Sequence, residues 1–246
     1  MPTREDSPRI LATRLVPLLD LTSLDEDDTP GKIDVLCARA RAGVLPAAVC
    51  IYPEHVTTAR RALAGTTVKI ATVVNFPDGG SDAARVEREI HRALGAGADE
   101  IDIVLPWAAF CHGDIAAARA VAEAARRACG AGHVLKLILE TGELATPERI
   151  RAAAELGIAA GVDFLKTSTG KVTVNATREA AAILLDAIAA HGGRCGFKAA
   201  GGIRRLEDAA DYLQLARERL GDAWITPAHF RIGASALYDE LTALLA

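Results

Sequence analysis

Lysine is scarce in this chain and is concentrated in short apolar runs of the kind that form buried strands. Of the 28 basic residues, 22 are arginines and six are lysines. Four of the six, Lys69, Lys136, Lys166 and Lys198, fall in such runs, and Lys171 follows just after one. A guanidinium stays protonated, whereas a desolvated amine, or one beside another cation, can lose its proton and act as a nucleophile. The distribution therefore indicates positions at which a titratable amine is useful, except for Lys69, which starts its run and is expected to be salt-bridged or to reach the surface.

Lys166 and Lys198 occupy corresponding positions in two successive apolar runs. We expect them to face each other across neighbouring strands, so that one ammonium lowers the pKa of the other amine. From an ordinary pKa of ~10.4, a lysine at pH 7 is neutral about once in 2500, and a pKa of ~7 raises that fraction about a thousandfold. The pair predicts amine–carbonyl chemistry through a lysine Schiff base.

Acidic and polar side chains also interrupt the runs that should be apolar. Asp20 and Thr22 close the first run, Asp102 lies within the fourth, and Glu140 shares a face of the fifth with Lys136. A buried charge is costly unless it is paired, so several in one fold imply a polar, functional interior. Asp102 could relay protons in the same cavity. Lys136 is either a partner of Asp20 or Asp102 or a participant in the reaction.

Two glycine clusters follow the last two runs and are typical of phosphate-binding loops. The first is Gly201-Gly202 and the second is Gly233-Ala234-Ser235, each just before a helical segment. Glycine lets backbone N–H groups approach an anion, and a helix N-terminus adds its dipole. In barrels of parallel strands, the loops after strands seven and eight commonly bind phosphate. We therefore expect a phosphate-bearing ligand at these loops.

The sequence contains no complete motif for binding a nucleotide cofactor. Ser168-Thr169-Gly170-Lys171 looks like part of a P-loop, but Leu165 and Val172 occupy positions that require glycine and Ser or Thr. The glycines at 95 and 97 lack the third glycine of a dinucleotide fingerprint and precede a strand. Neither ATP nor NAD is indicated, and we expect the protein to use no cofactor.

Apolar runs alternate with Ala-, Leu-, Glu- and Arg-rich helical segments along the whole chain, which is typical of repeated βα units around a parallel sheet. Helical segments are predicted after Ser81, up to Leu94, and after the N-cap Thr146. Eight uninterrupted units favour one α/β domain, a closed (β/α)8 barrel over residues 15–246, preceded by a polar arm at residues 1–14. The eight runs are Val16–Thr22, Ala47–Tyr52, Lys69–Phe76, Ala98–Leu105, Val134–Glu140, Asp163–Thr169, Cys195–Gly202 and Phe230–Ser235.

Composition excludes several other classes of protein. The formal net charge of -4 argues against binding to nucleic acid, and no apolar stretch is long enough to span a membrane. The five cysteines are widely spaced and form neither a disulfide pattern nor a metal-ligand set with the six histidines. The first 14 residues carry no apolar core of a signal peptide. We expect a cytoplasmic protein that can assemble with copies of itself and that binds no metal.

Seven segments of the chain, in the same order, closely resemble the 2-deoxyribose-5-phosphate aldolase family. The most specific are K-T-S-T-G-K at residues 166–171 and F-K-A-A-G-G at 197–202, and the others are Leu19–Thr22, Val49–Pro53, Val74–Pro77, Gly97–Asp102 and Lys136–Gly142. The resemblance covers nearly the whole chain. It implies a class I, metal-independent lyase that reversibly cleaves 2-deoxy-D-ribose 5-phosphate to D-glyceraldehyde 3-phosphate and acetaldehyde, in deoxyribonucleotide catabolism.

The resemblance also implies roles for individual residues. Lys166 aligns with the Schiff-base lysine, Lys198 with the lysine that lowers its pKa, and Asp102 with the proton-transfer aspartate. Thr169 and Cys50 align with pocket residues, and Lys171, Gly201, Gly202, Gly233 and Ser235 align with phosphate-binding positions. Together with the strand residues Asp20, Thr22 and Lys136, the residues Cys50, Thr169 and Lys171 are the candidates for substrate binding. Ala236 departs from the family, because many members have a serine there, and the chain ends without the terminal tyrosine of some members.

Two other functions stay open at this point. One is a barrel that acts on another sugar phosphate, either as a different class I aldolase or as an isomerase that uses Asp102 as its base. The other is a sugar-phosphate-binding barrel without catalysis, against which the presence of Lys166, Lys198 and Asp102 argues.

Overall fold

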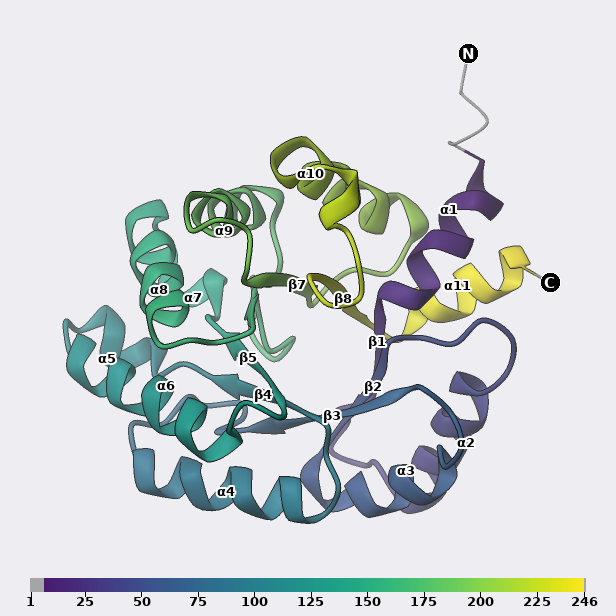
Figure 1. Cartoon of the computed structure of the whole chain (residues 1–246), viewed down its shortest axis with the longest axis horizontal. Coiled ribbons are helices and arrows are strands. Elements are labelled where there is room, and N and C mark those ends of the chain that lie inside the picture. Colours follow the sequence, from purple (N-terminus) through teal and green to yellow (C-terminus); the bar gives the residue numbers. More distant parts are fainter. Residues whose placement is uncertain (1–6, 246) are drawn as a thin grey trace.

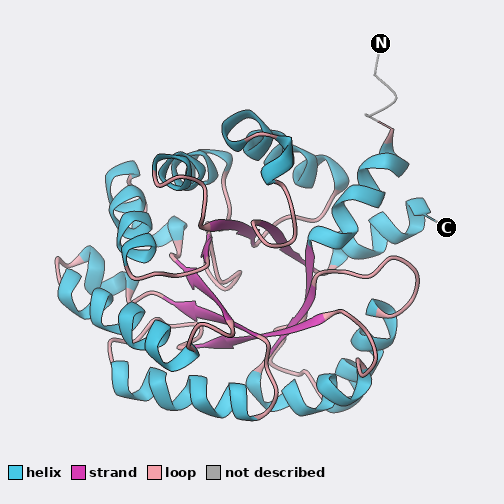
Figure 2. Ribbon diagram, viewed as in Figure 1, coloured by secondary structure: helices cyan, strands magenta, loops and turns pink. Residues whose placement is uncertain are grey.

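Eight parallel strands close into a barrel at the centre of the molecule (Figure 2). The computed structural model describes residues 7–245. Each strand pairs with the next along the chain, and the last pairs with the first. The strands are β1 (Leu19–Thr22), β2 (Ala48–Ile51), β3 (Lys69–Val74), β4 (Glu100–Val104), β5 (Val134–Ile138), β6 (Phe164–Lys166), β7 (Gly196–Ala200) and β8 (Phe230–Ala234). One strand lies in each of the eight expected runs, which confirms the single (β/α)8 domain.

Helices surround the barrel and cover the outer face of the sheet (Figure 1). The α-helices are α1 (Pro8–Leu15), α2 (Pro30–Ala40), α3 (Val56–Ala62), α4 (Ala83–Gly95), α5 (Trp107–Cys111), α6 (Ile115–Cys129), α7 (Thr141–Leu144), α8 (Pro147–Ala159), α9 (Arg178–Ala190), α10 (Leu206–Leu220) and α11 (Ala236–Leu245). Short 3-10 turns are η2 (Val16–Leu18), η3 (Pro53–His55) and η4 (Asp222–Trp224).

Side-chain caps explain where several helices begin. The side chains of Thr146 and Thr177 accept hydrogen bonds from the third residues of α8 and α9, as expected of an N-cap. Asp82, and not Ser81, plays this part for α4, because the Asp82 carboxylate accepts from the Arg85 N–H at 2.9 Å. The helix predicted after Ser81 therefore begins at Ala83.

Side chains alternate between the two faces of each strand, as the period of two requires. In β7, Phe197 and Ala199 join the apolar core between sheet and helices, whereas Lys198 contacts carboxylates of other strands inside the barrel. Lys166 of β6 lies in register with Lys198 of β7, which confirms that they occupy facing positions. Lys69, at the start of β3, is exposed. The barrel interior is thus the polar region.

The two ends of the described chain lie side by side, with α1 against α11 (Figure 1). Ala12 and Leu15 of α1 are buried, and the Arg9 guanidinium donates to the carbonyl oxygens of Leu244 and Leu245 at 3.3 and 3.0 Å. Part of the expected N-terminal arm is therefore a packed helix, while residues 1–6 lie outside the described part. Between residues 7 and 245, no helix has the length and apolar character needed to cross a membrane.

Candidate active site

Seven charged side chains meet inside the barrel. Each is at most 5% exposed, and they come from six of the eight strands. Strand register brings them together, because Asp102 pairs with Lys136, and Lys198 pairs with both Lys166 and Arg231. The basic members are Lys136, Lys166, Lys198 and Arg231, and the acidic members are Asp20, Glu100 and Asp102. We call this set the buried network.

Asp102 is the centre of the buried network. Its Oδ1 accepts from Lys136 Nζ at 2.8 Å, while its Oδ2 accepts from Lys166 Nζ at 2.8 Å and from Lys198 Nζ at 2.7 Å. One carboxylate therefore contacts all three buried lysines. The structure brings Lys166, Lys198 and Asp102 together, as the sequence predicted.

Asp20 and Lys136 lie within the network itself. Asp20 accepts from Lys198 Nζ at 2.5 Å and from Arg231 Nη1 at 2.6 Å. Lys136 Nζ lies 2.6 Å from the Glu100 carboxylate, which also accepts from Arg231 Nη2 at 3.0 Å. Both residues were candidates for substrate binding, and the structure places them as partners of the other charged groups.

Lys166 is the buried lysine whose pKa is lowered. Burial lowers it most, and the positive charge of Lys198 acts in the same direction, so that together they outweigh the attraction of Asp102. Burial also opposes the charges of Lys136 and Lys198, but neighbouring carboxylates outweigh it and raise both pKa values. Burial likewise opposes the charge of Asp102, yet the three lysines hold its pKa well below the usual range.

The charge balance of the network agrees with these directions. Four basic and three acidic groups leave one excess positive charge when all are ionised, and the charges balance when one base is neutral. An unbalanced charge is costly in a dry interior. Because Lys166 has the lowered pKa, it is the amine most readily deprotonated, and Lys136, Lys198 and Arg231 carry the three positive charges.

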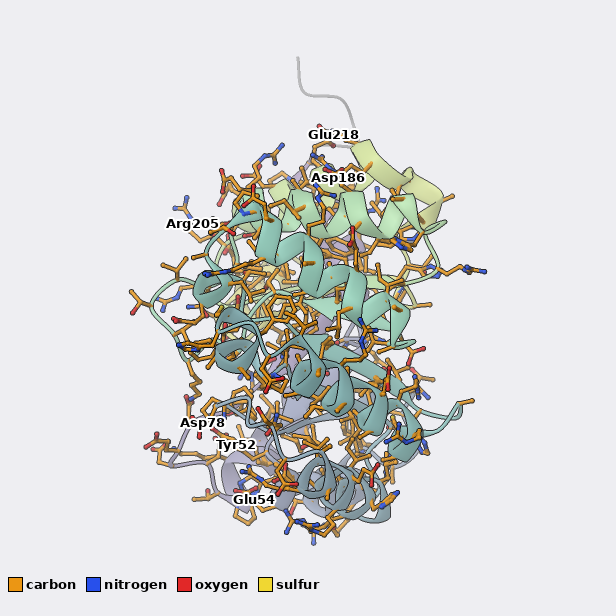
Figure 3. All side chains as sticks on the ribbon, turned by 90° about the vertical axis from the view of Figure 1, so that its left-hand side faces the viewer. Tyr52, Glu54, Asp78, Asp186, Arg205 and Glu218 are labelled. Carbon is orange, nitrogen blue, oxygen red and sulfur yellow. The ribbon has the colours of Figure 1, made fainter. Side chains whose placement is uncertain are left out.

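A cavity of about 480 Å³ opens where the strands end and reaches Lys166. Its walls come from the loops after β1, β6, β7 and β8 and from α2. Figure 3 shows this side of the barrel at its left, where the labelled Asp78 and Arg205 follow β3 and β7. Eight predicted site residues line this one cavity, namely Thr22, Lys166, Thr169, Lys171, Gly201, Gly202, Gly233 and Ser235.

The glycines of the two C-terminal loops are needed for close approach. Gly201 has a φ of 90°, and a Cβ there would lie 2.6 Å from the Asn175 Cβ. A Cβ on Gly233 would lie 3.2 Å from Lys198 Cε and 3.1 Å from the Ala200 Cβ. Gly233 therefore both lines the cavity and leaves room for Lys198.

Cys50 lies beside the reactive centre in an apolar setting. Its side chain is fully buried among Leu24, Ala71 and Val73, and its Sγ is 3.9 Å from Asp102 Oδ2. Burial raises the pKa of the thiol. Cys50 therefore packs against the network as a neutral thiol. In the described part of the chain, no set of His, Cys, Asp and Glu side chains is arranged to hold a metal ion.

Sequence reasoning missed three charged residues around the site. Glu100 and Arg231 belong to the buried network, and Glu140 accepts hydrogen bonds from Thr169 of the cavity wall. Glu100 and Arg231 could have been recognised from the sequence as charged residues inside apolar runs. Glu100 also lies two residues before Asp102 and therefore on the same face of the strand. Glu140 was placed on the face of Lys136 without its partner being recognised.

The fold and this site define a class of protein, a (β/α)8-barrel enzyme with a buried lysine and carboxylate at the base of a cavity with glycine-rich loops. Comparison with known proteins agrees with that class and identifies a family within it. Residues 15–240 match the family model described as DeoC/LacD family aldolase. A deoxyribose-phosphate aldolase from Agrobacterium fabrum (strain C58) is 50% identical over 241 residues, which make up 97% of this chain and 93% of that protein.

Solved structures show the same fold. A "putative deoxyribose-phosphate aldolase" from Toxoplasma gondii ME49 is 25% identical with a TM-score of 0.89, over 97% of this chain and 96% of that chain. A tetrameric deoxyribose phosphate aldolase from Aeropyrum pernix, 24% identical with a TM-score of 0.74, shares the fold over 98% of both chains. The chain belongs to the DeoC/LacD aldolase family, which confirms the resemblance read from its motifs.

Proposed function

We propose that this aldolase reversibly cleaves 2-deoxy-D-ribose 5-phosphate to D-glyceraldehyde 3-phosphate and acetaldehyde through a Schiff base on Lys166. The observation that carries the proposal is Lys166, a buried amine of lowered pKa that borders the cavity 2.8 Å from Asp102. The name of the 50% identical relative supports the substrate.

The chemistry begins with the neutral Lys166 amine, which adds to the C1 aldehyde of the open-chain sugar. The carbinolamine loses water to give an iminium ion, which accepts the electron pair of the C2–C3 bond as the C3 hydroxyl loses its proton. That step releases D-glyceraldehyde 3-phosphate and leaves an enamine. Protonation of the enamine at C2 and addition of water then release acetaldehyde and restore the amine.

Asp102 and Lys198 support the reaction of Lys166 in two different ways. Asp102 contacts the Lys166 amine directly, so it is placed to carry protons to and from the carbinolamine and the enamine. Lys198 keeps its charge through Asp20 and Asp102 and thereby disfavours the protonated form of Lys166. Lys136 donates a hydrogen bond to Oδ1 of Asp102 and thereby fixes the orientation of that carboxylate.

We infer that the phosphate binds at the loops after β7 and β8. Gly201, Gly202 and Gly233 offer backbone N–H groups, and Ser235 lies just before the first turn of α11. Lys171 supplies a nearby cation, and its Nζ donates to the Leu24 carbonyl oxygen at 2.6 Å. Ala236 lines the same cavity without a hydroxyl, so Ser235 is the hydroxyl donor expected at this turn.

The biological setting follows from the substrate. We propose that the enzyme acts in deoxyribonucleotide breakdown in the cytoplasm, with residues 15–246 forming the catalytic domain.

The test is to incubate the protein with 2-deoxy-D-ribose 5-phosphate and measure both products. Acetaldehyde and D-glyceraldehyde 3-phosphate should form in equal amounts, and Lys166→Ala should abolish turnover with its circular dichroism spectrum unchanged. Conversion of the substrate to an isomer without release of acetaldehyde would contradict the proposal and favour an isomerase.

A further inference from the structure

The segment that follows β5 packs against the loop that follows β6. Backbone hydrogen bonds continue between them beyond the strands, from the Leu139 N–H to the Lys166 carbonyl oxygen at 2.9 Å and from the Thr141 N–H to that of Thr167 at 3.0 Å. Between these two bonds, Glu140 adopts a φ of 56°, which is uncommon for a residue other than glycine. Such a conformation persists only where surrounding contacts hold it.

The carboxylate of Glu140 is held by Thr169. The Thr169 N–H donates to Oε1 at 3.2 Å, and the Thr169 hydroxyl donates to Oε2 at 2.5 Å. Glu140 is fully buried, and within residues 7–245 no Lys, Arg or His nitrogen lies within 4.0 Å of its carboxylate. The two donors of Thr169 are therefore its direct polar partners, unlike the lysine-paired carboxylates of the buried network.

This arrangement decides the direction of the Thr169 hydroxyl. A hydroxyl has one hydrogen to donate and two lone pairs that accept. The hydrogen is directed to Glu140, and one lone pair accepts from the Lys171 N–H at 3.0 Å. Thr169 lines the cavity, so the second lone pair is the part of the hydroxyl left for a ligand.

Two glycines allow the loop after β6 to take this position. A Cβ on Gly142 would lie 1.9 Å from the Val174 carbonyl oxygen, and a Cβ on Gly201 would lie 2.6 Å from the Asn175 Cβ. The loop is therefore packed between the Glu140 segment on one side and the loop after β7 on the other.

We propose that Glu140 is a positioning residue that makes Thr169 a hydrogen-bond acceptor, so that the site selects an aldehyde with a hydroxyl group next to its carbonyl carbon. This inference rests on the proposed function, because that hydroxyl is the one on C2 of D-glyceraldehyde 3-phosphate, which becomes the C4 hydroxyl of the sugar. A ligand that lacks it leaves the lone pair of Thr169 without a donor. Glu140 itself does not touch the reacting atoms.

Glu140→Gln tests the proposal with little change in shape. In the variant the amide oxygen accepts from the Thr169 N–H, which turns the amide NH₂ toward the Thr169 hydroxyl oxygen. That donor occupies a lone pair and releases the hydroxyl hydrogen, so Thr169 no longer presents an acceptor. The experiment measures condensation of acetaldehyde with D-glyceraldehyde 3-phosphate and with 3-phosphonooxypropanal, which lacks the hydroxyl.

We expect the wild-type protein to prefer D-glyceraldehyde 3-phosphate, and Glu140→Gln to reduce this preference about tenfold. The loss should come mainly from a higher KM for the hydroxylated aldehyde, and the kinetics of 3-phosphonooxypropanal should change much less. Thr169→Val should show the same loss, the double variant no further loss, and Thr169→Ser should keep the preference. Thermal unfolding of each variant checks that the fold is retained.

Three results would overturn the inference. One is a wild-type protein that does not distinguish the two aldehydes. Another is an equal loss of activity toward both aldehydes in Glu140→Gln, which a general structural role predicts, and the third is an unchanged preference in that variant. A wild-type protein that condenses neither aldehyde contradicts the proposed function instead, so the two failures are distinguishable.

Discussion

Lys166 and Lys198 both contact the Asp102 carboxylate, but they differ in how many carboxylates each of them contacts. Asp102 Oδ2 contacts both amines. Lys198 also forms an ion pair with Asp20, whereas, among the described residues, the ion pair of Lys166 is with Asp102 alone. Burial is similar for the two side chains. The opposite directions of their pKa values therefore follow from two causes: Asp20 raises the pKa of Lys198, and the charge of Lys198 lowers the pKa of Lys166. These two effects assign the nucleophile and the permanent cation to different residues.

Lys198→Met should move the acidic limb of the kcat/KM profile to higher pH by about one unit or more. Lys198 lowers the pKa of Lys166, so without its charge a larger share of Lys166 is protonated at a given pH. Only the neutral amine attacks the aldehyde, so activity is retained only at higher pH. The measurement is the pH dependence of aldol cleavage. Lys32→Met, at an exposed lysine paired with Asp27, is the control and should leave the profile unchanged.

The charge of Lys198 is not sufficient by itself. Lys198→Arg keeps a positive charge but places a larger, planar group beside Gly233, whose backbone is so close that a Cβ there would lie 3.2 Å from Lys198 Cε. We expect this variant to be severely impaired as well. Activity at the wild-type level would show that any cation at this position suffices.

Asp20→Asn should lower the free energy of unfolding by about 3–5 kcal/mol, because it removes the buried carboxylate that Lys198 and Arg231 share and adds to the excess of positive charge in the network. Urea unfolding at neutral pH measures this loss. The control is Asp27→Asn, which removes an exposed pair and should leave stability nearly unchanged. Equal stability of Asp20→Asn and wild type would mean that the network does not depend on this carboxylate.

The pH dependence of stability has a defined sign at Asp20. Burial opposes its charge, but Lys198, Lys136 and Arg231 lower its pKa below the ordinary value of 3.8. A carboxyl with a lowered folded-state pKa stabilises the fold fully above its ordinary pKa, and that contribution is lost as the pH falls below it. The wild-type protein should therefore lose stability in acid below pH 3.8 more steeply than Asp20→Asn.

At the scale of elements, the loops after β5, β6 and β7 pack against one another, and the loops after β6 and β7 line the cavity. Gly142 contacts the backbone of Val174, and Gly201 contacts Asn175 in the same loop. Because the loop after β6 carries Thr169 and Lys171, any displacement of it alters substrate binding. The wall is therefore defined by contacts between loops and not by one loop alone.

Gly142→Ala should raise the KM for the sugar phosphate about tenfold or more, since the new methyl group would lie 1.9 Å from the Val174 carbonyl oxygen and the loop must move. Steady-state kinetics with 2-deoxy-D-ribose 5-phosphate provides the check. Gly95→Ala is the matched control, because a Cβ at that helical position meets no atom within 4 Å. An unchanged KM in Gly142→Ala would show that the loop can adjust without affecting the site.

The elements were predictable from the sequence to a greater extent than the contacts among loops. Continuous apolar runs located all eight strands, and Thr146 located the start of α8, because these signals are local. The register between Lys166 and Lys198 followed from their matching positions. Glu140 could not be assigned, because its conformation and its bonds to Thr169 depend on how two loops distant in sequence pack.

At the scale of the whole molecule, the barrel separates a reactive end from a structural periphery. The cavity lies where the strands end, whereas α1 packs against α11 and joins the two ends of the described chain (Figure 1). Barrel enzymes divide function and stability in this way. Substitutions in α1 should therefore affect stability and not catalysis.

Leu15→Ala tests that separation. Leu15 is fully buried in the main core, so its truncation should lower the free energy of unfolding by about 2–5 kcal/mol while kcat and KM stay unchanged. Denaturant unfolding and kinetics on the same preparation measure both. Ile10→Ala, in the same helix but at a side chain 47% exposed, should cost much less. A loss of kcat without a loss of stability would contradict the separation.

The most direct measurement of the central claim is reduction with borohydride in the presence of acetaldehyde, followed by mass spectrometry of the peptides. The account predicts a two-carbon adduct on the peptide that contains Lys166, formed faster than on the peptides of the exposed Lys32 and Lys69, and absent at this position in Lys166→Ala. An unmodified Lys166 in a protein that still cleaves the sugar phosphate would contradict the Schiff-base mechanism.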